Sequence, residues 1–187
     1  MRFRARYFDK WDWCKTQPHP IVYKGEDRIE YCVFHAPKGK KGVSVDEFNR
    51  LVYEEIERAM AENRDCELSG TIFDGDIDFR KYGGNNRLPP INFTKALFNG
   101  RVDFRGAVFS GDANFFGAMF IKGADFSGAT FMGKAYFFDS EFLEKADFSS
   151  VRFVDELSFS WGSCKKEVEF AGAIFESNTN FKRPTFD

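Results

Sequence analysis

The sequence lacks the features of several common protein classes. Its 187 residues contain no run of 18 or more apolar residues, so no transmembrane helix is expected. The segment from Met1 to Phe8 lacks the apolar core of a secretory signal peptide, and we expect a cytoplasmic protein without a membrane partner. The formal net charge is only −2, which argues against a strongly basic nucleic-acid-binding protein.

Catalytic signatures are missing as well. The sequence contains no Ser/His/Asp pattern, no Walker motif and no dinucleotide-binding motif. It has only four Cys and two His, and in a cytosolic chain of this size so few cysteines argue against a disulfide framework. We therefore predict that the protein is not an enzyme.

Phenylalanine, in contrast, is abundant, with 25 copies in 187 residues. In the second half of the chain most of these residues recur at intervals that alternate between five and six. The members of this register are Phe93, Phe98, Phe104, Phe109, Phe115, Phe120, Phe126, Phe131, Phe137, Phe142, Phe148, Phe153, Phe159, Phe170, Phe175, Phe181 and Phe186. Cys164 occupies the one missing position, and Leu68, Phe73 and Phe79 continue the register upstream. Residues 80–90 contain a three-residue insertion whose Gly, Asn and Pro pairs predict a loop.

The spacing predicts a solenoid, because a period of five fits neither a helix nor a simple strand. A small residue usually lies two positions before each Phe and a Gly often lies two positions after it, as in Ala124-Asp-Phe-Ser-Gly128. In a short extended segment the Ala and the Phe point to the same side, and the Gly permits a corner with positive φ. Four sides of five, six, five and six residues make a coil of about 22, in which Phe residues of successive coils form ladders.

These units resemble the repeats of pentapeptide-repeat proteins, which centre on Leu or Phe with a small residue two positions earlier. The resemblance extends roughly from Leu68 to Phe186. It implies an all-β solenoid, specifically a right-handed quadrilateral β-helix. The extra residue at every second unit departs from the plain family pattern, so we expect a rectangular coil with bulged corners.

The segment before the repeats predicts a capping helix. Ser44-Val-Asp-Glu47 forms a capping box, and an apolar face follows at helical spacing. We expect this helix, at about residues 45–63, to close the first coil near Leu68 and Phe73, because a solenoid exposes an apolar end that must be covered. The alternative is that its apolar face binds a partner helix. The predicted units are thus residues 1–43, a small Cys/His segment, residues 44–65, the helix, and residues 66–187, the β-helix.

Both histidines lie close to cysteines, as Cys14-x4-His19 and Cys32-x2-His35. Structural zinc is commonly held by four N or S ligands in two close pairs, and we predict a structural Zn²⁺ site at these four residues. The second pair also resembles the zinc-knuckle segments that precede the repeats in some pentapeptide-repeat proteins. The alternatives are buried cysteines with incidental surface histidines, or a Cys/His nucleophile and base.

Aromatic residues that depart from the register are the candidate contact sites. Phe116 and Phe138 are 22 residues apart and are predicted to be exposed neighbours on adjacent coils, with Tyr136 and Trp161 nearby. The alternative is that loops or the N-terminal segment cover them. Phe186 lies at the predicted open end of the solenoid, where a second copy could stack. We predict a rigid protein-interaction module with a zinc-stabilised cap, and a homodimer formed through this end or through the aromatic patch.

The alternative function is modulation of a DNA topoisomerase by DNA mimicry, which some pentapeptide-repeat proteins perform. Residues 66–187 have the expected rod shape but carry 14 Lys and Arg against 17 Asp and Glu. This charge is too low to imitate duplex DNA closely, and no continuous basic stripe indicates nucleic-acid binding.

Overall fold

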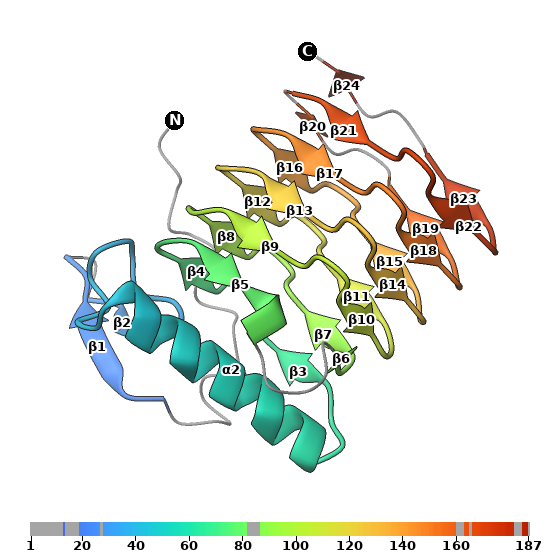
Figure 1. The fold of residues 1–187 in the computed structure, drawn as a ribbon. Coiled ribbons are helices and arrows are strands. Elements are labelled where there is room, and N and C mark those ends of the chain that lie inside the picture. Colours follow the sequence, from blue (N-terminus) through green and yellow to red (C-terminus); the bar gives the residue numbers. More distant parts are fainter. Residues whose placement is uncertain are drawn as a thin grey trace.

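The computed structural model describes residue 13 and residues 19–26, 28–81, 87–159, 163–164, 166–181 and 185–186. It confirms the β-solenoid, with parallel strands stacked in four sheets of five or six strands each. Figure 1 shows the coils rising from green to red. The register between coils is 22 residues from Ile91 onward, so Phe109 pairs with Phe131 and Phe131 pairs with Phe153. Before that point it is 25 for the strands that span the insertion and 21 between Leu88 and Phe109.

Each side of the coil is one sheet, and we number these four faces in chain order. The first face comprises β3 (Cys66–Glu67), β7 (Ile91–Asn92), β11 (Ala113–Asn114), β15 (Ala135–Tyr136), β19 (Leu157–Ser158) and β23 (Thr179–Asn180). The second face comprises β4 (Ile72–Phe73), β8 (Leu97–Phe98), β12 (Met119–Phe120), β16 (Glu141–Phe142), β20 (Ser163–Cys164) and β24 (Thr185–Phe186).

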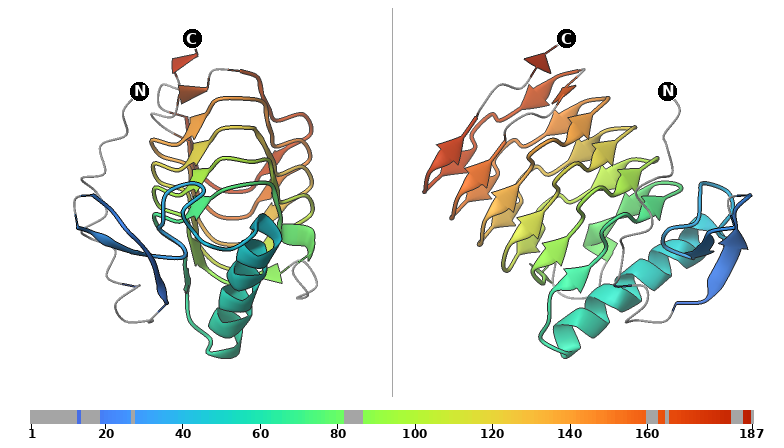
Figure 2. Two further views of the ribbon diagram at one scale, coloured as in Figure 1. Left: turned by 90° about the vertical axis from the view of Figure 1, so that its left-hand side faces the viewer. Right: turned by 180° about the vertical axis from the view of Figure 1, so that it is seen from behind.

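The other two faces complete the rectangle. The third face comprises β5 (Ile77–Asp78), β9 (Val102–Asp103), β13 (Ala124–Asp125), β17 (Ala146–Asp147) and β21 (Val168–Glu169). The fourth comprises β6 (Arg87–Leu88), β10 (Val108–Phe109), β14 (Thr130–Phe131), β18 (Arg152–Phe153) and β22 (Ile174–Phe175). The views in Figure 2 show that these short strands alternate with tight corners.

The predicted Phe ladders fill the interior. Phe104, Phe126 and Phe148 are fully buried and stack along the axis, with ring centroids 4.9 Å and 4.7 Å apart. Neighbouring ladders meet edge to face, as in the pair Phe126 and Phe137 at 5.5 Å and 90°. Stacked and T-shaped contacts are the two arrangements that aromatic rings favour. The small residue two positions earlier is buried beside the ladder, as expected for Ala124.

The alternation of five and six residues reflects two kinds of corner. The five-residue intervals contain a turn in which the third residue has a positive φ, such as Gly106 (64°) or Gly128 (67°). The turn closes with a hydrogen bond from the Ala107 amide to the Phe104 carbonyl at 3.0 Å, and a positive φ at this position is typical of a type II turn. The six-residue intervals contain wider bends, in which the glycine conformation varies: Gly100 has no positive φ, whereas Gly123 has a φ of 99°. The expected positive φ of the corner glycines is therefore confirmed at the five-residue corners, and the extra residue lies in the other corners.

Ser150 occupies a five-residue corner with φ of 57°, which is strained for a residue with a side chain. We expect Ser150→Gly to stabilise the protein by about 0.5–1 kcal/mol in urea unfolding, since relief of the strain exceeds the entropy cost of glycine. The matched control is Ser149→Gly in the same turn, where φ is not positive and a loss of about 0.5–1 kcal/mol is expected. Equal effects of the two substitutions would contradict this assignment of the turn.

On the first and third faces, an Asp or Asn that precedes the central Phe also shapes the corners. The Asp125 carboxylate accepts a hydrogen bond from the Ser127 amide at 2.9 Å, and the Asn114 side-chain oxygen accepts one from the Phe116 amide at 2.9 Å. Such bonds to the backbone two residues on are typical of Asx turns. The Asp or Asn therefore closes the turn that leaves the strand.

Leu88 continues the fourth-face ladder where the Phe register is interrupted. It is fully buried, and in the sheet it pairs with Phe109. The insertion thus lies between η2 (Phe79–Lys81) and β6, and the coil resumes at Arg87.

The predicted capping helix is α2, Val45–Ala61, and it lies across the first coil (Figure 2). The Ser44 hydroxyl accepts a hydrogen bond from the Glu47 amide at 3.2 Å, as an N-cap does. Phe48 contacts Phe73 of the first coil, with ring centroids 5.8 Å apart. The Tyr53 hydroxyl donates to the Asp78 carbonyl at 2.7 Å. The helix thus covers apolar surface and satisfies backbone groups at the edge of the solenoid.

One charged residue lies on the buried side of α2. The Glu55 side chain is 1% exposed, and its oxygens bind Arg58 and Arg64, each at 2.9 Å. Burial raises the pKa of the neighbouring Cys66 thiol, whose side chain is enclosed between the helix and the first coil. Cys66 is therefore an inert core residue.

Candidate functional site

The aromatic pair predicted from sequence lies at the corner between the first and second faces. Phe116 and Phe138 stack on adjacent coils, with ring centroids 5.5 Å apart and an interplanar angle of 7°. Phe138 is 36% exposed and Phe116 is partly exposed, whereas Phe115 and Phe137 beside them are fully buried. The corner therefore presents an aromatic stack to solvent directly outside the core ladder.

The other predicted contact residues differ in position. Tyr136 is half-buried on the outer side of the first face, in register with Asn114 and Ser158. Trp161 lies outside the described residues, and so does the side chain of Phe186, whose backbone belongs to β24. Among the described residues, Phe116, Phe138 and Tyr136 thus form the candidate contact patch.

The Cys/His segment packs against the first coil, at the corner between the first and second faces, where His35 and Phe34 contact Ser69 and Ile72. An antiparallel hairpin of β1 (Ile21–Lys24) and β2 (Glu30–Cys32) leads into a tight turn. In this turn the amides of His35 and Ala36 donate to the Cys32 carbonyl, at 3.1 Å and 2.9 Å. The turn brings Cys32 Sγ and His35 Nδ1 to 3.3 Å, and His35 Nε2 lies 2.9 Å from the Ser69 carbonyl oxygen.

This geometry assigns the histidine tautomer. A carbonyl only accepts, so Nε2 of His35 carries the hydrogen and the Nδ1 lone pair faces the Cys32 sulfur. Two ligands of a tetrahedral zinc ion, one S and one N, lie about 3.5 Å apart. A backbone carbonyl that fixes the other ring nitrogen is the usual support for a metal-bound His. Cys32 and His35 therefore have the arrangement of one half of a zinc site.

His19 lies in the same region. Its ring is 5.5 Å from that of Trp13, which is itself 5.3 Å from the ring of His35. Its Nε2 is buried and has no hydrogen-bond partner, and burial lowers the pKa of His19, which favours the neutral form that binds metals. Cys14 lies outside the described residues. Within the described ranges, no three His, Cys, Asp or Glu side chains are close enough together to hold a metal ion.

Lys41 supports this turn and was not singled out in the sequence. It is 2% exposed, its Nζ donates to the carbonyls of Val33 and Phe34 at 2.5 Å and 3.1 Å, and it lies 4.1 Å from the ring centroid of Phe48. Burial lowers the pKa of Lys41 to about 8. In the sequence it belongs to a run of Lys and Gly that is typical of an exposed loop.

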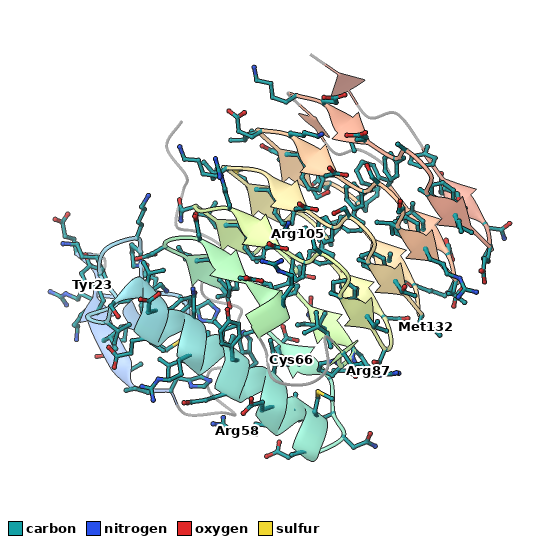
Figure 3. The ribbon with its side chains drawn as sticks, in the orientation of Figure 1. Tyr23, Arg58, Cys66, Arg87, Arg105 and Met132 are labelled. Atoms are coloured by element: carbon teal, nitrogen blue, oxygen red, sulfur yellow. The ribbon has the colours of Figure 1, made fainter. Side chains whose placement is uncertain are left out.

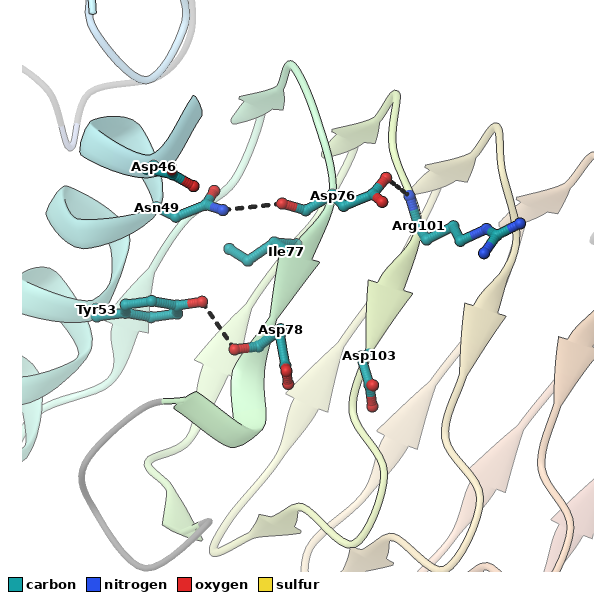
Figure 4. Close-up of a pocket in the computed structure, with 8 residues that line it drawn as sticks. All are labelled: Asp46, Asn49, Tyr53, Asp76, Ile77, Asp78, Arg101 and Asp103. Carbon is teal, nitrogen blue, oxygen red and sulfur yellow. Dashed lines mark hydrogen bonds between the residues drawn. The ribbon is translucent and has the colours of Figure 1, made fainter. Parts of the chain in front are cut away.

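A cavity of about 420 Å³ opens between α2 and the first two coils (Figure 4). Four carboxylates line it, but those of the first coil already have structural partners. Asp76 accepts from the Arg101 amide at 2.8 Å, and Asp78 binds Arg80 at 2.9 Å. The cavity is therefore part of the contact between the cap and the solenoid.

The comparison with family models agrees with this architecture. Residues 93–141 match the model described as pentapeptide repeats, with nine copies. Residues 93–141 of the solenoid are therefore pentapeptide repeats, and the same 22-residue register continues beyond them, as in the pair of Phe131 with Phe153. No curated protein and no solved structure matches the chain. No helix among the described residues is long and apolar enough to cross a membrane.

The third face of the solenoid carries a row of carboxylates, one on each successive coil. Cations are interspersed in this row, including Arg105, which Figure 3 labels. Arg80 lies 3.0 Å from Asp103, and Arg105 lies 3.6 Å from Asp125. The row is therefore largely neutralised, which does not favour imitation of the dense phosphate charge of DNA.

Proposed function

We propose that the protein is a non-enzymatic interaction module, in which a rigid pentapeptide-repeat β-helix presents the Phe116–Phe138 stack to a protein partner. The observation that supports this most strongly is the exposure of two parallel phenyl rings beside a core that already buries the register Phe residues. Aromatic side chains on a rigid support lose little conformational entropy on binding, and they are enriched at the centres of interfaces.

The double substitution Phe116→Ser with Phe138→Ser tests this proposal. We expect it to reduce recovery of partner proteins from the source cells at least about tenfold, measured by quantitative mass spectrometry, because it removes both rings of the stack. The matched control is Met132→Ser, which removes another exposed apolar side chain at a different corner and should leave recovery unchanged. Unchanged recovery with the double variant, at an unchanged melting temperature, would contradict the proposal.

Self-association is the second mode of contact that we propose. In the last described coil Phe175 is 38% exposed and Phe181 is 48% exposed, so apolar surface is available for stacking with a second copy. Light scattering of the purified protein tests this mode, since a homodimer doubles the measured mass. A dimer that survives the Phe116/Phe138 double substitution would use this coil, whereas one that dissociates would use the aromatic stack.

We also propose that a structural Zn²⁺ ion stabilises the cap, with Cys14, His19, Cys32 and His35 as its ligands. The orphaned Nε2 of His19 and the orientation of the Cys32–His35 pair support this assignment. A bound ion would tie the hairpin to the turn, and the contact between His35 and Ser69 would connect that turn to the first coil. Zinc in such a closed site supplies folding energy.

Metal analysis of the purified protein checks this assignment. We expect about one zinc per chain, and we expect Cys32→Ser to lose it because a thiolate ligand is removed. Cys66→Ala is the matched control, since it removes a buried thiol on the other side of the cap and should retain the zinc. A zinc-free wild-type protein purified without chelator, with a reactive Cys32 thiol, would refute the site.

A further inference from the structure

The outer side of the second face carries an apolar row that the cap covers only at its beginning. Ile72, Leu97 and Met119 occupy equivalent positions on three successive coils. Ile72 is only 7% exposed, and its amide donates to the Phe34 carbonyl of the cap at 2.9 Å. Leu97 and Met119 remain partly exposed. The cap thus covers the row at Ile72 on the first coil, and the same row continues uncovered by the cap at Leu97 and Met119 on the next two coils.

The two corners beside this row widen it. Phe116 and Phe138 border it on one side, and Ile121 and Leu143, both partly exposed, border it on the other. We call the whole surface the apolar stripe; its members are Leu97, Phe116, Met119, Ile121, Phe138 and Leu143. It runs parallel to the solenoid axis across three coils, with Glu141 as the polar member of the row on the third of them.

The repeat distance along the stripe matches the turn of an α-helix. Phe116 and Phe138 are 5.5 Å apart, and parallel strands of adjacent coils lie about 4.8 Å apart. An α-helix rises about 5.4 Å per turn, and its side chains at i and i+4 lie about 5–6 Å apart. In an extended strand, residues on one side are about 6.6 Å apart. A helix parallel to the solenoid axis can therefore contact successive coils with successive turns.

Charges around the stripe change sign along it. The segment 94–101 and the segment 116–123 contain three cations and no carboxylate; the cations are Lys95, Arg101 and Lys122. On the next coil the segment 138–145 contains three carboxylates, those of Asp139, Glu141 and Glu144. Its one cation, Lys145, is bound to Glu169 at 2.7 Å. This distribution complements a helix dipole whose positive N-terminus lies over the carboxylates and whose negative C-terminus lies over the cations.

We propose that the apolar stripe binds an amphipathic α-helix of a partner protein, about three turns long and parallel to the solenoid axis. The N-terminus of the helix lies over Asp139 and Glu141, and its C-terminus lies over Lys95. Apolar side chains at i, i+4 and i+7 contact the three coils in turn. This inference rests on the proposed interaction function and specifies the partner's secondary structure and direction.

Site-specific photo-cross-linking tests both specifications. The photoreactive amino acid benzoylphenylalanine replaces Leu97, Met119 or Glu141 in three separate variants of the full chain, and each variant is irradiated in the source cells. We expect the three variants to label one partner segment at positions three or four residues apart. The site labelled from position 141 should lie nearest the N-terminus of that segment. The control is the probe at Thr130 on the opposite, fourth face, which should not label the segment.

Several outcomes would overturn the helix while leaving the interaction function intact. Labelled sites one or two residues apart would indicate an extended strand, and the reverse order would contradict the direction. Labelling of the chain's own first 18 residues, or of a second copy, would show that the stripe is covered in another way. Loss of partner recovery with Phe116→Ser and Phe138→Ser, without any label from positions 97, 119 and 141, would confine the interface to the corner and also refute the proposal.

A charge variant gives a second measurement that does not depend on the probe. Lys95→Glu combined with Lys122→Glu should weaken recovery of the partner at least about tenfold, because it replaces the two cations beside the C-terminal half of the helix with carboxylates. Both side chains are exposed, so the fold should be retained. Unchanged recovery would contradict the proposed direction.

Discussion

Phe126→Ala should destabilise the protein by about 3–5 kcal/mol, which is the usual cost of truncating a buried aromatic residue. Phe126 is fully buried and lies near the middle of its ladder, between Phe104 and Phe148. It also meets Phe115 and Phe137 edge to face, at 5.6 Å and 5.5 Å. The surrounding rings belong to strands of rigid coils, so they cannot move together to fill the cavity.

Urea unfolding monitored by circular dichroism measures this loss, and two variants give the scale. Phe126→Leu keeps most of the volume and should cost less than about 1.5 kcal/mol. Phe175→Ala removes a ring that is 38% exposed in the last described coil, and its cost should be clearly smaller than that of Phe126→Ala. If Phe126→Ala cost no more than Phe175→Ala, the central ladder would not determine the stability of the solenoid.

The fold could be predicted from the sequence because each coil repeats the same short pattern of inward-pointing residues. A Phe on a short strand must point inward, and the register of five and six brings Phe109, Phe131 and Phe153 to the same face. The helix was predicted equally well, since Ser44 and the apolar spacing mark its start and its buried face. Val45 and Met60, which lie in the first and last turns of α2, remain 39% and 40% exposed although they share the apolar spacing.

The corners could not be predicted in detail. Their conformation depends on hydrogen bonds between side chain and backbone, such as that between Asp125 and the Ser127 amide, and on which glycines require positive φ. The sequence contained a signal for the hydrogen bonds from side chain to backbone, since Asp or Asn precedes the central Phe at many of the alternate units, as at Asn114 and Asp125. Leu88 was missed for a different reason, because the insertion displaces it from the Phe spacing while the sheet register restores it.

In the candidate sites, the features that depend on residues close in sequence were predicted, and those that depend on distant residues were not. Phe116 and Phe138 were identified because they depart from a regular local pattern. The pairing of Cys32 with His35 was also local. The acceptor of His35 is the Ser69 carbonyl, 34 residues away, and Lys41 is buried only because the turn folds over α2. Such contacts arise from the docking of the cap on the solenoid, and no spacing within the segment encodes them.

Gly100→Ala should cost about 3 kcal/mol or more, although the substitution adds a single methyl group. Gly100 lies in the wide corner between the second and third faces, where its backbone packs against that of the first coil. A Cβ atom there would overlap the carbonyl group of Gly75 and the amide nitrogen of Asp76. Backbone atoms cannot rotate away as the end of a flexible side chain does, so the two coils would have to separate locally.

The control Gly106→Ala separates this steric effect from backbone strain. Gly106 has φ of 64°, and no atom lies within 4 Å of the point that an alanine methyl group would occupy, so alanine there should cost only about 1–2 kcal/mol. Separation at Gly100 would also break the hydrogen bond from the Arg101 amide to Asp76 and would loosen Asn49 of α2, which donates to the Asp76 carbonyl at 2.8 Å. Hydrogen exchange should therefore accelerate at Arg101 and in α2 but not at Phe126. Equal losses for the two glycines would mean that the corners tolerate a wider coil spacing, and that the cap does not depend on the fit of Gly100 against Gly75.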